Sequence, residues 1–141
     1  LLVAGCQKES TGFALPEGDV VAGKRVFVDL RCNDCHSVAD IDYAESEVPV
    51  EYMGKKTTGK IHVVLGGKTS RYRSQGELVA SVINPGHRIS TSYERHLATA
   101  DSPMGNYNQV MSVQNLIDLV TFLQGEYDIA PARTMETHRD Q

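Results

Sequence analysis

The chain has 141 residues, no tryptophan and a formal net charge of −4 at pH 7. This length predicts a single domain. The mild negative charge argues against a nucleic-acid partner, which would call for a strongly basic surface. No apolar run is long enough to cross a bilayer as a helix.

The chain starts with Leu1-Leu2-Val3-Ala4-Gly5-Cys6. This stretch resembles the end of a bacterial lipoprotein signal peptide, where small residues precede a cysteine that becomes the lipidated N-terminus. The resemblance implies that residues 1–5 are removed and that acyl chains on Cys6 hold the protein on a membrane. The alternative is an ordinary buried or free thiol near the terminus. Residues 7–17 are poor in apolar side chains and predict a tether.

A first helix is predicted to begin at Gly18-Asp19, with Asp19 as its N-cap. The apolar residues that follow recur at helical spacing and form one face of this helix. They are Val20, Gly23, Phe27 and Leu30. The helix leads the chain directly to Cys32.

The stretch Cys32-Asn33-Asp34-Cys35-His36 has the pattern C-x-x-C-H, which is the pattern for covalent attachment of c-type haem. Thiols at this spacing on a helical turn face one porphyrin edge and can add across its vinyl groups. The imidazole of His36 can then reach the iron from the proximal side, where imidazole is a common ligand.

The C-x-x-C pattern alone also occurs in redox dithiols and in zinc sites. A zinc site would need a second pair of ligands, but the only other cysteine in the sequence is Cys6. A thioredoxin-like motif would belong to a βαβ pattern, which this sequence does not show. Haem attachment is therefore the favoured interpretation.

With this motif the chain resembles the class I cytochrome c family, whose members carry one haem, over residues 19–125. The resemblance rests on the stretch 18–27 before the haem motif, on a methionine near position 104 and on a closing apolar helix. It implies an all-α fold in which a bundle of main helices, about three in number, surrounds one covalently bound haem c. It also implies that Gly23 and Phe27 lie where the first helix crosses the last one, near Phe122.

The charge of the chain changes sign in its middle. Residues 38–53 are acidic and show no convincing period, so we expect an irregular loop over one haem edge. Residues 55–73 contain six basic and no acidic side chains. The two segments are candidate docking surfaces for a redox partner, because charge steers the encounter between proteins.

A short β-hairpin is predicted within the basic segment. Ile61, Val63 and Leu65 occupy alternating positions before Gly66-Gly67, where the chain is expected to turn and return over residues 68–73. This insertion departs from the smallest cytochromes c, in which the segment is mostly loop.

Ser74-Gln75-Gly76-Glu77 has the pattern of a capping box and predicts a second helix. Its apolar side carries Leu78, Val79, Val82 and Ile83, and Asn84-Pro85-Gly86 ends it. The family resemblance places this helix beside the haem. Residues on either side of the helix are candidates for binding haem propionates, with an ordinary surface position as the alternative. They are Arg71, Tyr72, Arg73, Arg88 and Tyr93.

Met104 is predicted to be the second axial ligand. In the family this ligand is a methionine on the loop before the last helix, often followed by proline, whereas here Pro103 precedes it. A thioether ligand suits an electron-transfer haem. The competitor Met111 resembles an apolar core residue of the family. Four histidines are further candidates for axial ligation, namely His62, His87, His96 and His138.

Ser112 is expected to cap the last helix, which keeps an apolar i, i+3, i+4, i+7 spacing and ends at Gly125. Its apolar residues are Val113, Leu116, Ile117, Leu119, Val120, Phe122 and Leu123. The expected organisation is a signal remnant, anchor cysteine and tether over residues 1–17, a cytochrome c domain over 18–126 and a C-terminal tail over 127–141.

A haem held by His36 and Met104 would have no open coordination site, which predicts single-electron transfer between periplasmic or membrane redox partners in transient complexes. The sequence shows no catalytic acid–base or nucleophile constellation, so we expect an electron carrier and not an enzyme. In the family, haem is attached outside the cytoplasmic membrane, and together with Cys6 this predicts a lipid-anchored protein on the periplasmic side of a bacterial membrane, with a Gram-positive surface as the alternative. Two different functions stay open: the electron-accepting haem subunit of a larger oxidoreductase, and a haem sensor or enzyme with an open distal site.

Overall fold

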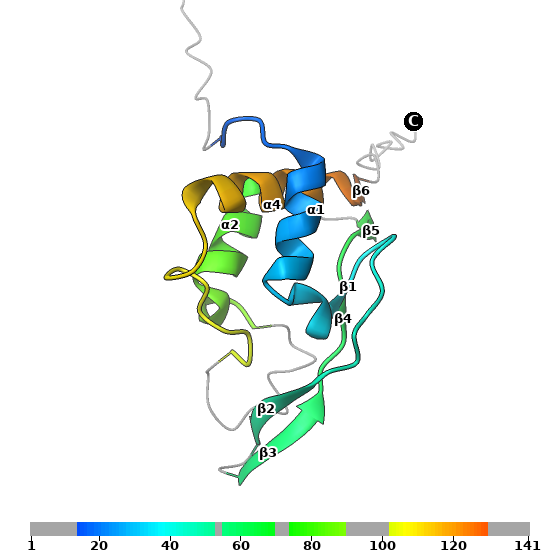
Figure 1. Cartoon of the computed structure of the whole chain (residues 1–141), viewed down its shortest axis with the longest axis vertical. Coiled ribbons are helices and arrows are strands. Elements are labelled where there is room, and N and C mark those ends of the chain that lie inside the picture. The colour runs from blue at the N-terminus through cyan, green and yellow to red at the C-terminus, as the bar shows by residue number, and fades with distance from the viewer. Residues whose placement is uncertain (1–13, 53–54, 70–73, 90–101, 130–141) are drawn as a thin grey trace, which may run out of the picture.

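The computed structural model describes residues 14–52, 55–69, 74–89 and 102–129. Within these residues the helices are α1 (Val20–Asp29), α2 (Gln75–Ile83) and α4 (Val113–Gly125), with the 3-10 turns η1 (Cys32–Asp34) and η2 (Pro85–His87). The strands are β1 (His36–Ser37), β2 (Glu47–Tyr52), β3 (Lys55–Lys60), β4 (Val63–Val64), β5 (Gly67–Thr69) and β6 (Tyr127–Ile129). Figure 1 shows α1 and α4 crossing at one end of a helical body, with α2 beside them and the strands along one edge. The predicted helical fold with a small strand insertion is confirmed.

Helix α1 begins at the predicted cap. The side chain of Asp19 accepts a hydrogen bond from the backbone N–H of Ala22 at 2.8 Å, which satisfies a free donor of the first turn. The backbone N–H of Asp19 donates in turn to Oδ1 of Asp118 at 2.9 Å. Asp118 lies on α4 and is buried, and its Oδ1 also accepts from Nε2 of Gln114 at 2.9 Å. A buried carboxylate on α4 thus ties the start of α1 to the last helix.

The crossing of α1 and α4 leaves no room for a side chain at Gly23. A Cβ built there would overlap the backbone carbonyl of Asp118 and the Cβ of Phe122. Beside this point Phe27 packs edge-to-face on Phe122, with 6.0 Å between the ring centroids and 71° between the ring planes. Such aromatic pairs add stability beyond the area that they bury. The helices therefore approach closely at a glycine, as the family resemblance implied.

The hydrophobic core forms where α1, α2 and α4 meet. Its buried members are Val26, Phe27, Val38, Leu78, Val82, Leu119, Val120, Phe122 and Leu123. Three residues of the expected apolar faces are more than a third exposed, namely Val20 at 52%, Ile83 at 39% and Val113 at 74%. Each is the first or last residue of its helix, so it extends past the end of the buried stripe.

The β-hairpin lies earlier in the chain than predicted. Strands β2 and β3 pair antiparallel over residues 47–60, so the expectation of an irregular loop is wrong for residues 47–52. Pro49 interrupts the strand pattern in the sequence. A two-stranded hairpin tolerates a proline, because both of its strands are edge strands with one side free of backbone pairing.

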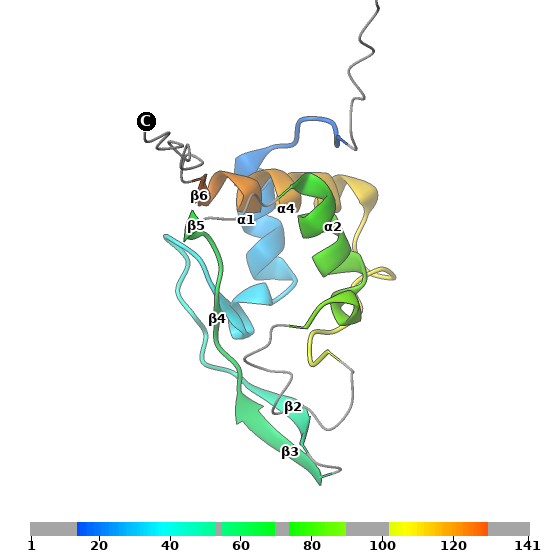
Figure 2. The ribbon, with the colours of Figure 1, turned by 180° about the vertical axis from the view of Figure 1, so that it is seen from behind.

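Opposite charges face each other across this hairpin. The register sets Glu47 opposite Lys60 at the base of the hairpin. The ammonium group of Lys60 also lies 3.0 Å from a carboxylate oxygen of Glu45 in an exposed ion pair. The end of the acidic segment and the start of the basic segment therefore pair in one hairpin, and their role in docking a partner stays a prediction. Figures 1 and 2 show the hairpin projecting from the body at the end away from the α1–α4 crossing.

Gly66 and Gly67 do not form the predicted hairpin turn. Both have positive φ, at 86° and 79°, which glycine adopts without a steric penalty. They lead the chain to the end of α4, where the N–H of Gly67 donates to the carbonyl of Glu126 at 2.8 Å. Strand β5 then pairs in parallel with β6, which comprises the first residues of the expected tail, and β4 pairs in parallel with β1. The local sequence pattern indicates strands here, but it cannot identify with which distant strands they pair.

Replacing Gly23 with alanine should destabilise the protein, because the added methyl group overlaps backbone atoms of α4. We expect the free energy of unfolding to fall by about 1–3 kcal/mol or more. Chemical denaturation of the variant and the wild type measures the difference. Gly125→Ala is the matched control, because a Cβ there meets nothing within 4 Å. Equal stability of the two variants would contradict the close crossing.

Candidate functional site

The C-x-x-C-H motif lies at the tight turn that follows α1. Arg31 adopts a left-handed conformation with φ 57°, which redirects the chain into η1. Nε of Arg31 also lies 2.9 Å from Oδ2 of Asp34, in an ion pair across the turn. The backbone N–H of Cys35 donates to the carbonyl of Cys32 at 3.2 Å. Both cysteines are thereby held on one turn, as their spacing predicts.

The thiols of Cys32 and Cys35 are free and half-buried. Burial raises the pKa of Cys32 to about 11. Burial also raises the pKa of Cys35, and Asp34 adds to this effect. Redox-active C-x-x-C motifs have a lowered thiol pKa, because the thiolate is the reactive species. The surroundings of this pair keep both thiols neutral and fit haem attachment better than a redox dithiol.

His36 leads the chain from the motif into β1. The backbone N–H of Val63 on β4 donates to the carbonyl of Cys35 at 2.8 Å, which fixes the backbone just before His36. Burial lowers the pKa of His36, and the backbone of Val63 opposes this effect more weakly. Its Nδ1 is buried and has no hydrogen-bond partner among the residues that the structure describes. A neutral imidazole with an unpaired buried nitrogen is suited to bind a metal, so His36 fits the predicted proximal role.

Met104 lies in the loop that precedes α4 and is half-buried. Its backbone N–H donates to Oγ of Ser102 at 3.2 Å. Farther along the loop, Nδ2 of Asn108 donates to the carbonyl of Ile83 at 2.9 Å, which holds the loop against the end of α2. Met111 instead packs against the hydrophobic core, in agreement with its interpretation as a core residue.

The haem motif and the methionine loop lie at the same end of the helical body, as Figures 1 and 2 show. Tyr107, on the methionine loop, interacts electrostatically with the haem motif. Burial raises the pKa of Tyr107, and the ionisable groups of the motif raise it further, so this ring lies within electrostatic reach of both thiols. The sequence interpretation missed Tyr107, although an aromatic residue three positions after Met104 in a Gly- and Asn-containing loop was a usable signal.

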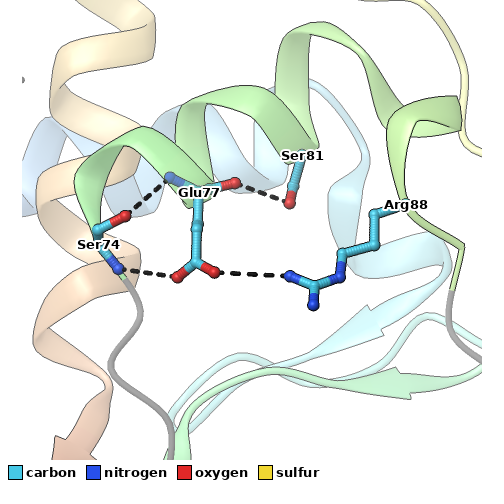
Figure 3. Close-up of polar contacts among 4 residues, drawn as sticks. All are labelled: Ser74, Glu77, Ser81 and Arg88. Atoms are coloured by element: carbon cyan, nitrogen blue, oxygen red, sulfur yellow. Dashed lines mark hydrogen bonds and ion pairs between the residues drawn. The ribbon is translucent and has the colours of Figure 1, made fainter.

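Figure 3 shows the polar contacts of Glu77 at the start of α2. The predicted capping box is present: Oγ of Ser74 accepts from the N–H of Glu77 at 3.1 Å, and the Glu77 carboxylate accepts from the N–H of Ser74 at 3.2 Å. The other carboxylate oxygen lies 3.5 Å from Nη1 of Arg88. Arg88 therefore meets an acidic partner on α2, and its contact with a haem propionate stays a prediction. The remaining propionate candidates and the anchor cysteine lie outside the described residues; they are Arg71, Tyr72, Arg73, Tyr93 and Cys6.

The residues that the structure describes fit a covalently held haem. They supply two neutral thiols, an imidazole with an unpaired buried nitrogen and a half-buried thioether at one end of the molecule. Over these same residues, no group of three or more His, Cys, Asp or Glu side chains could hold a metal ion. None of the helices in the described ranges has the length and apolar character needed to span a membrane.

Glu77→Ala should lower the free energy of unfolding by about 1–2 kcal/mol, because it removes one half of the capping box. Arg88→Ala should cost less than about 0.5 kcal/mol, because an exposed ion pair contributes little. Thermal denaturation of both variants beside the wild type tests this difference. An equal loss in the two variants would mean that Arg88 has a structural role beyond its pair with Glu77.

A family model described as "Cytochrome c" matches residues 20–125. The matched span begins with α1, contains the C-x-x-C-H motif and Met104, and ends with α4. No curated protein and no solved structure gives a significant match to the chain. Proteins of the matched family bind c-type haem and generally carry electrons, which agrees with the donor set described above. The chain belongs to the cytochrome c family and works in haem-based electron transfer.

Proposed function

We propose that the chain is a single-haem electron carrier that is anchored to a membrane by lipid. Cys32 and Cys35 hold the haem through thioether bonds, and His36 and Met104 are its axial ligands. The observation that carries this proposal is the donor set itself: two neutral thiols on one turn and, directly after them, an imidazole with a buried nitrogen that has no partner among the described residues, in a chain of the cytochrome c family.

Met104 is proposed as the distal ligand because its loop lies at the same end of the body as the motif. Tyr107, on the same loop, is within electrostatic reach of both thiols. The hydrogen bond from Asn108 to Ile83 attaches this loop to α2, so Met104 is presented from a supported segment. Met111 is occupied by core packing.

When bound, c-type haem supplies an iron that gains and loses one electron. Two axial side chains leave no open position for a substrate, so the residues of this chain hold and tune the group without taking part in bond chemistry. The soft thioether of Met104 favours the reduced state, and burial favours it further. Arg71, Tyr72, Arg88 and Tyr93 are proposed to bind the propionates.

Redox partners are proposed to dock briefly through a small interface at the end of the body that carries the motif. The β2–β3 hairpin projects from this end, so an arriving partner also meets the hairpin. At its base Lys60 lies beside Glu45 and opposite Glu47, which reduces the electrostatic field that these three residues present to a partner. Lipid on Cys6 would keep the domain on the periplasmic side of a bacterial membrane, where it meets its partners in two dimensions.

The oxidised holoprotein should show the weak far-red charge-transfer band of thioether-to-ferric ligation. Met104→Ala should abolish this band and give a spectrum that changes when carbon monoxide is added after reduction. Met111→Ala is the matched control, because it removes a core thioether and should leave the band in place while lowering stability. An unchanged band in Met104→Ala would eliminate Met104 as the axial ligand.

Cys6→Ser should release the haem protein from the membrane fraction into the soluble fraction, because it removes the atom that carries the lipid. Expression in a bacterium with an outer membrane, followed by fractionation and detection of haem, measures the distribution. Metabolic labelling with a radioactive fatty acid should mark the wild type and leave the variant unlabelled. A variant that still takes up the fatty-acid label would refute anchoring through Cys6.

A further inference from the structure

An aromatic stack lies beside the proximal histidine without contributing to the donor set. The rings of Tyr43 and His62 are parallel within 12°, with 4.2 Å between their centroids. Nε2 of His62 lies 2.8 Å from Oγ of Ser37, within hydrogen-bond distance. Ser37 directly follows His36 on β1. The stack is therefore connected to the proximal ligand through one neighbouring residue.

The loop between β1 and β2 joins the haem motif to the strand that supports it. The hydroxyl of Tyr43 donates to the carbonyl of Ile61 at 3.0 Å, just before His62 and β4. The adjacent Ala44 donates its backbone N–H to the carbonyl of Asn33, inside the C-x-x-C turn, at 2.9 Å. Two consecutive residues of this loop thus hold η1 from one side and the approach to β4 from the other.

The pairing of β1 and β4 is short, so contacts from neighbouring residues matter for its stability. Each strand has two residues, and the register is His36↔Val63 and Ser37↔Val64. A pair of strands this short is marginal without further contacts. The side chain of Ser37 on β1 contacts that of His62, which directly precedes β4, so this contact adds to the backbone pairing next to the ligand.

We infer that Tyr43, His62 and Ser37 form a positioning clamp that fixes the orientation of the His36 imidazole toward the iron. The inference rests on the proposed role of His36 as proximal ligand. Residues around a metal-bound histidine set its ring orientation and its donor strength. Losing the clamp allows β4 to separate from β1 and the His36 ring to rotate, which changes the electronic environment of the iron.

The clamp is tested on the haem-loaded protein with Tyr43→Ala, His62→Ala and Ser37→Ala. The EPR spectrum of the oxidised state reports the orientation of the axial ligands, and a redox titration reports the midpoint potential. Amide hydrogen exchange at Val63 and Leu65 reports the β1–β4 pairing, since their N–H groups donate to the carbonyls of Cys35 and Ser37, on either side of His36. We expect shifted EPR g values, a shifted potential and exchange that is faster by on the order of tenfold at these two amides.

Two control variants separate positioning from general loss of stability. Val64→Ala lies on β4 and truncates a side chain that is 71% exposed, so it should leave all three readouts unchanged. Gly66→Ala is strained at φ 86° and places a Cβ 2.7 Å from the carbonyl oxygen of Glu126, so it lowers stability where the chain meets the end of α4. It should lower the melting temperature and leave the EPR spectrum as in the wild type.

The variants also test whether the three residues act together. The Ser37→Ala/His62→Ala double variant should speed amide exchange no more than His62→Ala does, because both changes break the same contact. If Tyr43→Ala does not accumulate with haem, Ser37→Ala removes only a hydroxyl and is judged by the same readouts.

Wild-type g values and potential in the clamp variants would overturn the inference, even if their melting temperatures fall. This outcome would leave electron transfer by the haem untouched. Conversely, a wild-type spectrum without thioether ligation would refute Met104 as the distal ligand. The comparison of clamp variants with the wild type would still decide the inference, because it concerns the proximal side alone.

Discussion

The close approach of α1 and α4 at Gly23 is the constraint on which the rest of the structure depends. No side chain separates the helices at this point, so the backbone of Asp118 and the ring of Phe122 define how they cross. The C-terminal end of α1 leads within one turn to Cys32, and the N-terminal end of α4 follows the loop that carries Met104. One helix crossing therefore determines where both segments with haem chemistry emerge.

The strand insertion supports the chain on the side of His36, the proposed proximal ligand. The chain leaves the haem motif through β1, forms the hairpin of β2 and β3, and returns as β4 to pair with β1. The insertion therefore contributes to the proposed haem site, because its return strand pairs with the backbone of His36. The aromatic stack of Tyr43 on His62 lies directly before this return strand, and in the inference drawn above it supports a short strand pairing. An exposed element and the proposed iron ligand are thus linked through two short strands.

Much of the fold and part of the site could be predicted because the responsible interactions are local. Asp19 and Ser74 cap their helices through contacts with residues three positions away, so a short sequence window contains both partners. The C-x-x-C-H motif is equally local. The hairpin was placed wrongly because Gly66-Gly67 has the composition of a turn, whereas its conformation carries the chain to the end of α4. Nothing within a short window distinguishes these two outcomes.

The chemistry of the site follows from neighbouring residues in the chain, since two thiols and an imidazole at fixed spacing suffice to indicate haem attachment. Their environment depends on the folded molecule. Burial raises the pKa of both thiols, Nδ1 of His36 has no partner among the described residues, and the buried Asp118 holds the start of α1 against α4. These properties arise between residues far apart in the sequence, because desolvation and hydrogen bonding depend on which groups tertiary packing brings together and not on their order along the chain.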